Sequence, residues 1–310
     1  MTDNPITIPL RAVPYFPSLS QRGRNIENNR YMFYQDIQTG IMPYRMKSNF
    51  KCVFEGPEDG VLVARSILSL LSRNRPDDNE EETVCNALRE ICKTLAWDGV
   101  ANYEIMRENE SHKPIRLSMF TNKRLIATPL GYFQIVPKED YHTLNKKITF
   151  IPKASVWRVK IPMDLGGHRG FPKIVSALGR FNYMGPKFWL TALENQEAQF
   201  LFSFSEYAET CRAYQSESIR NWRWDFRGLF QNNSTEFYSL LRGVEFRIAL
   251  AVLREHLIGE INLLFHHLCL DCTLKIDGLF TAAQLKKIRI DFIKNDIPFH
   301  EIYERTSIDA

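Results

Sequence analysis

The chain has 310 residues, enough for one large domain or two of ordinary size, and its 44% hydrophobic and 25% charged residues are typical of a globular protein. Forty Lys and Arg against 36 Asp and Glu give a net charge of +4, too small by itself to indicate a nucleic-acid-binding protein. The N-terminus lacks the apolar run of a signal peptide, and charges interrupt the most apolar long segment, residues 244–270, so no membrane span is expected.

Residues 1–56 are predicted to form an extended N-terminal arm. Five of the fifteen prolines lie in the first 50 residues, where each removes a backbone N–H donor. Large aromatic residues also occur there, and we expect them to be buried on a neighbouring subunit. These candidates for an oligomer contact are Tyr15, Phe16, Tyr31, Phe33 and Tyr34. Two alternatives remain open: a disordered tail, and aromatic side chains that fold back onto their own subunit.

Two helices are predicted next. The first starts at Pro57, and its apolar residues recur every three or four positions, at Val61, Ala64, Ile67, Leu68 and Leu71. In the second, Asn79 is a candidate N-cap, Glu80–Glu82 occupy the first turn and Asp98-Gly99 ends the helix. Its predicted buried face consists of Val84, Leu88, Ile91 and Leu95. The acidic run is explained by a helix start, and a docking patch is the alternative.

Strand patterns follow the second helix and then give way to helical ones. Six short strands separated by turn residues predict one small antiparallel meander; they cover residues 101–107, 115–119, 125–128, 132–136, 148–151 and 155–161. Helices are predicted at 174–188, 190–204, 207–221, 236–270 and 281–295. The helix at 236–270 has the strongest pattern, with a predicted buried side of Val244, Ile248, Val252, Leu257, Ile261, Leu264 and Leu268. The expected fold class is α+β: an arm at 1–56, an α+β core at 57–175 and a helical region at 176–310.

Catalytic and metal-binding signatures are sparse. The stretch FHHLCLDC, residues 265–272, brings together His266, His267, Cys269 and Cys272, but a structural zinc site needs a second ligand pair that this stretch lacks. We therefore expect free thiols and no metal. The sequence has neither a G-x-S-x-G motif nor a P-loop. A protein without enzymatic activity, catalytic residues or cofactor is expected.

Basic residues concentrate in the middle of the chain. Residues 138–187 contain ten Lys or Arg and only three acidic residues. This excess indicates an anionic partner, either DNA or an acidic neighbouring subunit. The candidates for contact with DNA or another anion are Lys146, Lys147, Lys153, Arg158, Lys160, Arg169, Lys173, Arg220, Arg223 and Arg227.

The last three of these arginines belong to the stretch RNWRWDFRGLF, residues 220–230. On a helix they share one face, while Trp222 and Phe226 share another, a combination that suits phosphate contact with base stacking. The alternative is a core helix whose arginines extend from the aromatic side into solvent.

Four segments between Asp59 and Leu178 match short sequence patterns. The segment DGVANYEI at 98–105 is similar to the pattern G-N-A-Y-x-x-I, and it precedes a short β meander to which PIRL at 114–117 belongs. The segment IPKASVWR at 151–158 is similar to the pattern I-P-x-x-D-V-x-H, although Lys153-Ala154-Ser155 lacks the acidic residue. The segment GFPKI at 170–174 is similar to the helix start G-x-S-x-L. Together these segments resemble portal (head–tail connector) proteins of tailed phages.

The resemblance implies a subunit of a ring of about twelve copies at the capsid vertex, a channel for double-stranded DNA. It also implies capsid, packaging-motor and tail-adaptor partners, no membrane, and a place in the virion after assembly in the host cytoplasm. Two other classes remain open: a nucleic-acid-binding or host-interaction protein of a mobile element, and a metal-dependent nuclease.

Overall fold

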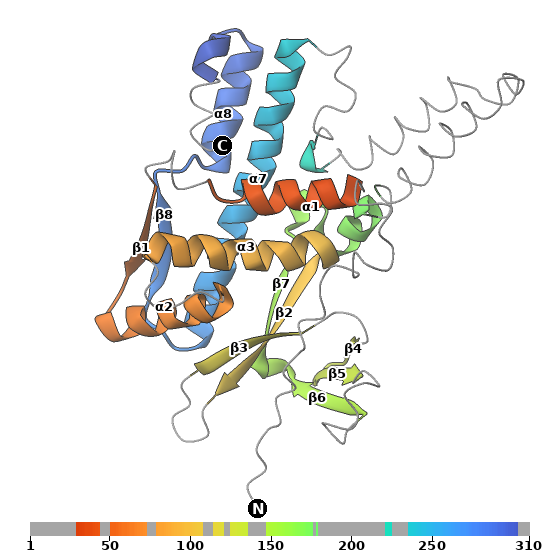
Figure 1. Ribbon diagram of the computed structural model, residues 1–310, viewed down its shortest axis with the longest axis vertical. Helices are drawn as coiled ribbons and strands as arrows, with labels where there is room; N and C mark the ends of the chain where they lie inside the picture. Colours follow the sequence, from red (N-terminus) through yellow and green to blue (C-terminus); the bar gives the residue numbers. More distant parts are fainter. Residues whose placement is uncertain are drawn as a thin grey trace, which may run out of the picture. The chain divides into compact units, whose positions relative to one another are not determined.

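The computed structural model (Figure 1) describes residues 29–43, 50–72, 79–107, 114–120, 125–135, 147–175, 178, 221–224 and 235–302. Helices and small antiparallel sheets make the fold α+β, as the sequence predicted. The described residues form two units: the first contains 54–160 and 260–275, and the second contains 29–53, 161–259 and 276–302. Whereas the sequence suggested three consecutive regions, each unit combines segments that are distant in the chain.

Helices α2 (Glu58–Ser72) and α3 (Glu80–Asp98) pack against each other in the first unit (Figure 1). The predicted apolar faces of both helices are buried. The Asn79 side chain accepts a hydrogen bond from the Glu81 N–H and so caps α3, as predicted. At the other end Gly99 has a φ of 73°, and its N–H donates to the Leu95 carbonyl at 2.7 Å. Only glycine adopts this left-handed conformation at no steric cost, so the helix ends there.

The strands after α3 form two three-stranded antiparallel sheets rather than the single meander expected. The first sheet has the order β3-β2-β7, from β2 (Val100–Arg107), β3 (Pro114–Phe120) and β7 (Val156–Lys160). The second has the order β4-β5-β6, from β4 (Leu125–Ala127), β5 (Gly131–Ile135) and β6 (Ile148–Pro152). The prediction of one meander is wrong because β2 pairs on its second side with β7, the last strand of the series.

The first sheet is covered on both faces. On one face Tyr103 pairs with Met119 and Trp157, and the Met119 sulfur accepts a hydrogen bond from Thr94 Oγ1 of α3. On the other face Phe120 clusters with two residues of the second sheet, Tyr132 and Ile151. The first unit is therefore layered, with α3, the first sheet and the second sheet in succession, and α2 packs on α3 and β3.

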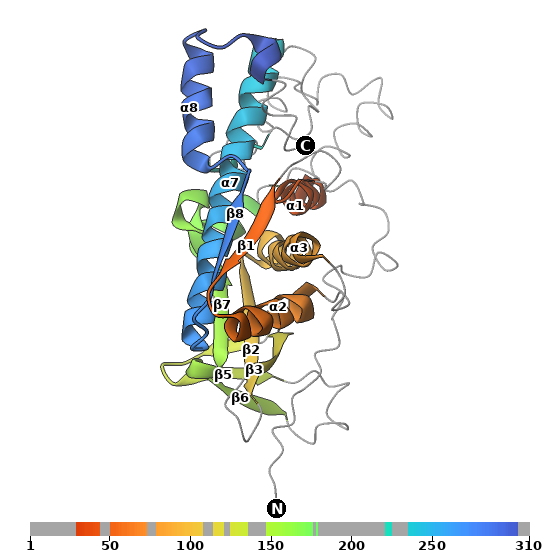
Figure 2. The same ribbon diagram turned by 90° about the vertical axis from the view of Figure 1, so that its left-hand side faces the viewer.

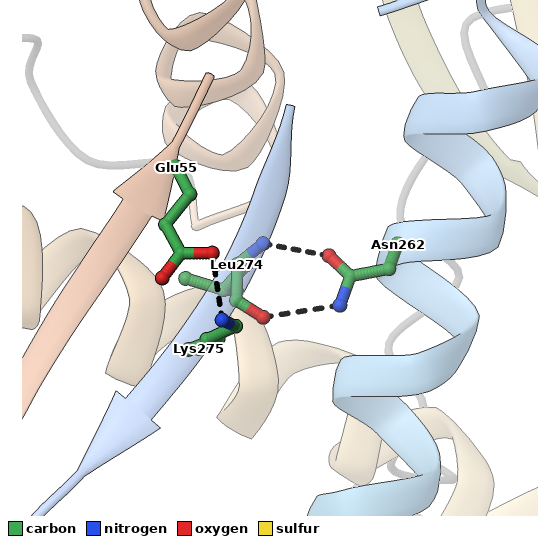
Figure 3. A network of polar contacts seen from close by, with 4 residues as sticks. All are labelled: Glu55, Asn262, Leu274 and Lys275. Carbon is green, nitrogen blue, oxygen red and sulfur yellow. Dashed lines mark hydrogen bonds and ion pairs between the residues drawn. The ribbon is translucent and has the colours of Figure 1, made fainter. Parts of the chain in front are cut away.

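Two short strands that the sequence did not suggest form a separate ribbon, β1 (Lys51–Glu55) and β8 (Thr273–Asp277). Glu55 and Lys275 form an ion pair at 2.6 Å. Asn262 on α7 binds β8 through both atoms of its amide, as Figure 3 shows: Nδ2 donates to the Leu274 carbonyl at 3.0 Å, and Oδ1 accepts from the Leu274 N–H at 2.7 Å.

The long helix predicted at 236–270 is α7 (Glu236–His267), and α8 (Ala282–Ile293) follows β8. The expected side of α7 is buried from Val244 to Leu268, with Ile248 and Val252 partly exposed. In the second unit, Ala251 packs against Ala282, Leu285 and Ile288, and Figures 1 and 2 show α8 lying along this part of α7. A capping box of Thr281 and Gln284 starts α8.

The structure describes residues 29–43 and 50–56 of the predicted N-terminal arm, and the first of these segments is largely helical. Helix α1 (Asn29–Gly40) corrects the prediction of extended structure over these residues, and Ile37 within the helix and Ile41 directly after it are buried. Residues 1–28 of the predicted arm lie outside the described residues. Nearby prolines misled the prediction, since none lies within α1 itself. Residues 167–175 are also helical. The predicted helix at 190–204, most of the one at 174–188 and all but Asn221 of the one at 207–221 lie outside the described residues. Among the helices that the structure describes, none combines the length and apolarity needed to cross a membrane.

Candidate interaction surfaces

An aromatic cluster in the second unit contains Phe33, one of the residues predicted to contact a neighbouring subunit. Phe33 of α1 lies 5.3 Å from Trp222, 5.2 Å from Trp224 and 6.3 Å from Phe171, measured between ring centroids. Only 1% of its surface is exposed. Tyr34 is also buried, and Tyr31 lies 6.0 Å from its ring.

This burial corrects the expectation that Phe33 and Tyr34 contact a neighbouring subunit. Both side chains are buried within their own chain, which was the alternative left open. The reason is long-range: the rings that cover Phe33 come from residues 171, 222 and 224. Tyr15 and Phe16 lie outside the described residues.

The two indole groups of the cluster are anchored by hydrogen bonds. Trp222 Nε1 donates to the Leu165 carbonyl at 3.0 Å, and Trp224 Nε1 donates to Asp36 Oδ2 at 2.8 Å. Both tryptophans are buried, so Trp222 is not available for stacking on a base. Arg223, which lies between them in the sequence, is half exposed, and its Nε lies 4.0 Å from Glu245 Oε2. Arg289 Nε lies 3.7 Å from Oε1 of the same carboxylate.

The other basic candidates divide between the two units. Lys147, Lys153 and Lys160 are exposed in the first unit, at the start and end of β6 and the end of β7. Arg169 and Lys173 are exposed on the helical segment 167–175 of the second unit. The remaining candidates that the sequence named, Lys146, Arg220 and Arg227, lie outside the described residues.

Arg158 differs from these lysines because its guanidinium is committed to a partner in the same unit. It lies 5.6 Å from the Tyr132 ring centroid, and Nη1 lies 3.5 Å from the Tyr132 hydroxyl oxygen. Arg158 is on β7 and Tyr132 on β5, so this contact joins the two sheets. We assign Arg158 a structural role between the sheets.

The outer face of the second sheet is an apolar surface that sequence reasoning missed. Ile126, Phe133 and Phe150 lie side by side across β4, β5 and β6, and Ile148 is two residues before Phe150 on the same face. All four side chains are exposed, and the two phenylalanine rings lie 5.0 Å apart. A signal was present: β5 and β6 carry apolar residues on both faces, which is typical of strands covered on both sides.

The cysteine- and histidine-containing stretch after α7 forms no cluster of ligands. Within the described part of the chain, no three His, Cys, Asp or Glu side chains are grouped as a metal site would need. His267 Nε2 lies 3.1 Å from the Ala154 carbonyl, Cys269 is exposed and Cys272 is buried. Cys92, Cys269 and Cys272 are free thiols, and burial raises the pKa values of Cys92 and Cys272.

No protein-family model matches the chain, and no curated protein matches it. The chain does match solved structures. A chain described as "Neck of empty GTA particle computed with C6 symmetry" has a TM-score of 0.51 at 12% identity, over 91% of this chain and 90% of the other. A chain from "Virion of native gene transfer agent (GTA) particle" has a TM-score of 0.50 at 10% identity, over 91% and 89%. At such low identity the likeness shows a shared fold, and it extends over nearly the full length of each chain.

Proposed function

We propose that this chain is a structural subunit of a phage-like particle and forms a ring at the neck, as a portal does. The shared fold with a neck chain of a gene transfer agent particle carries this proposal. Its extent matters, because the likeness includes both units and about nine tenths of either chain. The symmetry used for that neck, C6, supports a ring of identical subunits.

Within this proposal the ring is a channel for double-stranded DNA and contacts capsid, packaging-motor and tail-adaptor proteins in the virion. Helix α7 is long enough to line such a channel, since 32 residues extend about 48 Å. Exposed Lys160, Arg169 and Lys173 are the described basic residues proposed to face DNA. The chain itself has no catalytic role in this scheme.

The purified full-length chain tests the proposal. Mass photometry and negative-stain images should show closed rings of one copy number. A protein that stays monomeric over the whole accessible concentration range would contradict a ring-forming role. Salt-dependent DNA binding by that monomer would instead favour a nucleic-acid-binding protein, which the exposed lysines also fit. Mg²⁺-dependent cleavage of DNA would contradict the non-catalytic role.

A further inference from the structure

Two surfaces of the first unit have complementary chemistry. The sheet patch consists of the exposed apolar residues Ile126, Phe133, Ile148 and Phe150 on the outer side of the second sheet, together with the exposed residues Leu130, Lys147 and Lys153, which lie at the ends of its strands. The α2 patch consists of Leu62 and Leu70 with Glu58 and Asp59. An exposed apolar surface of several neighbouring side chains marks an interaction site on a soluble protein.

The sheet patch is built by the strand register. Because side chains alternate along a strand, Tyr132 and Ile151 enter the core while Phe133 and Phe150 point the other way. Leu130 is 80% exposed, and Ile148 is 55% exposed. The Lys153 N–H donates to the Leu130 carbonyl at 3.1 Å, which places this lysine beside the patch. Lys147 immediately precedes Ile148.

The charge of the sheet patch has one sign among the described residues. Residues 125–135 and 147–153 contain these two lysines and no Asp or Glu. A surface that is apolar with a positive border fits a surface that is apolar with a negative border.

The α2 patch meets that requirement. At 100° per residue, Glu58, Asp59, Leu62 and Leu70 occupy one side of α2, and the buried residues Val61, Ala64 and Leu68 occupy the other. Leu62 is 55% exposed. The one basic residue of α2, Arg65, forms an ion pair with Glu80 and lies over the Phe54 ring, so it does not neutralise this acidic border.

The two patches also have the placement that a ring needs. Helix α3 covers one face of the first sheet and the second sheet covers the other, while α2 packs beside α3 (Figure 1). The sheet patch and the α2 patch therefore point away from different sides of the same unit. A contact between two different patches repeats from copy to copy, and it closes into a ring when the rotation allows.

We propose that the sheet patch of one copy binds the α2 patch of the next copy. This inference rests on the proposed ring of identical subunits, and it names the surfaces that hold the ring together. It assigns Lys147 and Lys153, for which the sequence left DNA and an acidic neighbouring subunit open, to the neighbouring subunit.

Two variants that each lose one patch test this contact by complementation. The sheet variant carries Ile148→Glu and Lys153→Glu, and the α2 variant carries Asp59→Lys and Leu62→Lys. All four positions are exposed, so the circular dichroism spectrum should match the wild type, and thermal unfolding should match it at concentrations too low for the wild type to assemble. Each variant alone should be a monomer in mass photometry, because one half of every contact is missing. Mixed in equal amounts they should form a dimer that does not grow, because only one intact pair of patches remains.

A matched control is Leu263→Glu, which changes an exposed leucine of the same unit outside both patches and should leave assembly unchanged. The inference is overturned if both variants still form rings, since the patches then have another occupant. It is also overturned if the α2 variant alone dimerises, which would indicate a sheet-to-sheet contact, or if the folded variants do not pair on mixing. In each of these cases, a wild type that still forms rings would agree with the proposed function, and only the assignment of the two patches would be wrong. A monomeric wild type would reject the proposed function itself.

Discussion

The aromatic cluster around Phe33 and the sheet patch around Phe133 are two groups of phenylalanines in opposite environments. Phe33 is 1% exposed because Trp222 and Trp224 enclose it. Phe133 is 36% exposed and has Phe150 as its aromatic neighbour. The sequence suggested the reverse, a partner-binding role for Phe33 and an ordinary strand for Phe133. The difference shows that distant chain segments, rather than local composition, decide which aromatic residues remain available to a partner.

The largest expected effect comes from truncating the first of these rings. Phe33→Ala should lower the free energy of unfolding by about 3–5 kcal/mol, because it leaves a cavity among buried rings. Chemical denaturation followed by tryptophan fluorescence measures it directly, since Trp222 and Trp224 report on the cavity.

Phe133→Ala is the matched variant in the sheet patch. Its cost in the isolated chain should be about 1 kcal/mol or less, because an exposed ring loses little apolar burial. That cost should grow with protein concentration as copies associate, whereas the cost of Phe33→Ala should stay constant. The comparison between the two regions would fail if both variants lowered the free energy of unfolding by the same amount at every protein concentration.

An effect smaller than that of Phe33→Ala is expected at Gly131, where β5 passes close to Phe150 and Ile151 of β6. A Cβ at this position would lie 2.4 Å from the Ile151 carbonyl oxygen and 2.8 Å from Phe150 Cζ. Gly131→Ala should therefore cost about 1–3 kcal/mol, because the neighbouring strand cannot move without breaking its pairing. It should also displace the Phe150 ring and weaken assembly. Urea unfolding and mass photometry measure the two effects.

Gly259→Ala in α7 is the control for that substitution, since no atom other than those of its chain neighbours and the surrounding helix backbone lies within 4 Å of its Cβ position. Alanine in a helix interior should increase stability by about 0.5–1 kcal/mol. A Gly131→Ala variant as stable as the wild type would mean that the close strand approach is not needed.

The smallest effect concerns Glu104 of β2. Burial raises the pKa of this carboxyl above its ordinary range, because the charged form is less well solvated in the sheet. The folded chain then holds the proton more tightly than the unfolded chain, so stability falls as pH rises from the ordinary pKa through the raised one.

Glu104→Gln removes this titration and should be more stable than the wild type at neutral pH. The difference should shrink as the pH falls towards the ordinary range of glutamate, where the carboxyl is protonated in both states. Thermal unfolding between pH 4 and 7 tests this. A less stable Gln variant at pH 7 would show that the carboxylate has a stabilising partner.

What the sequence predicted well depends on neighbours in the chain. Asn79 and Gly99 determine both ends of α3 through local hydrogen bonds and a left-handed turn, so the boundaries of this helix were readable. The buried side of α7 was also readable, because its period is that of a helix.

What it missed depends on pairing between distant segments. The strands β1 and β8 are five residues each and pair across most of the chain, so neither segment alone indicates its partner. The division into two sheets follows from β2 pairing with β7, which no local pattern encodes. The sheet patch was missed for the same reason: which face of β5 is covered depends on the first sheet.

The amide of Asn262 has a consequence for misassembly. A strand at the edge of a sheet carries unpaired backbone groups that can recruit another strand, and a two-stranded ribbon consists only of edges. Asn262 occupies both backbone groups of Leu274 and so imitates one residue of an additional strand (Figure 3). In a particle where many copies of one chain are concentrated together, this amide would block strand exchange between copies at β8.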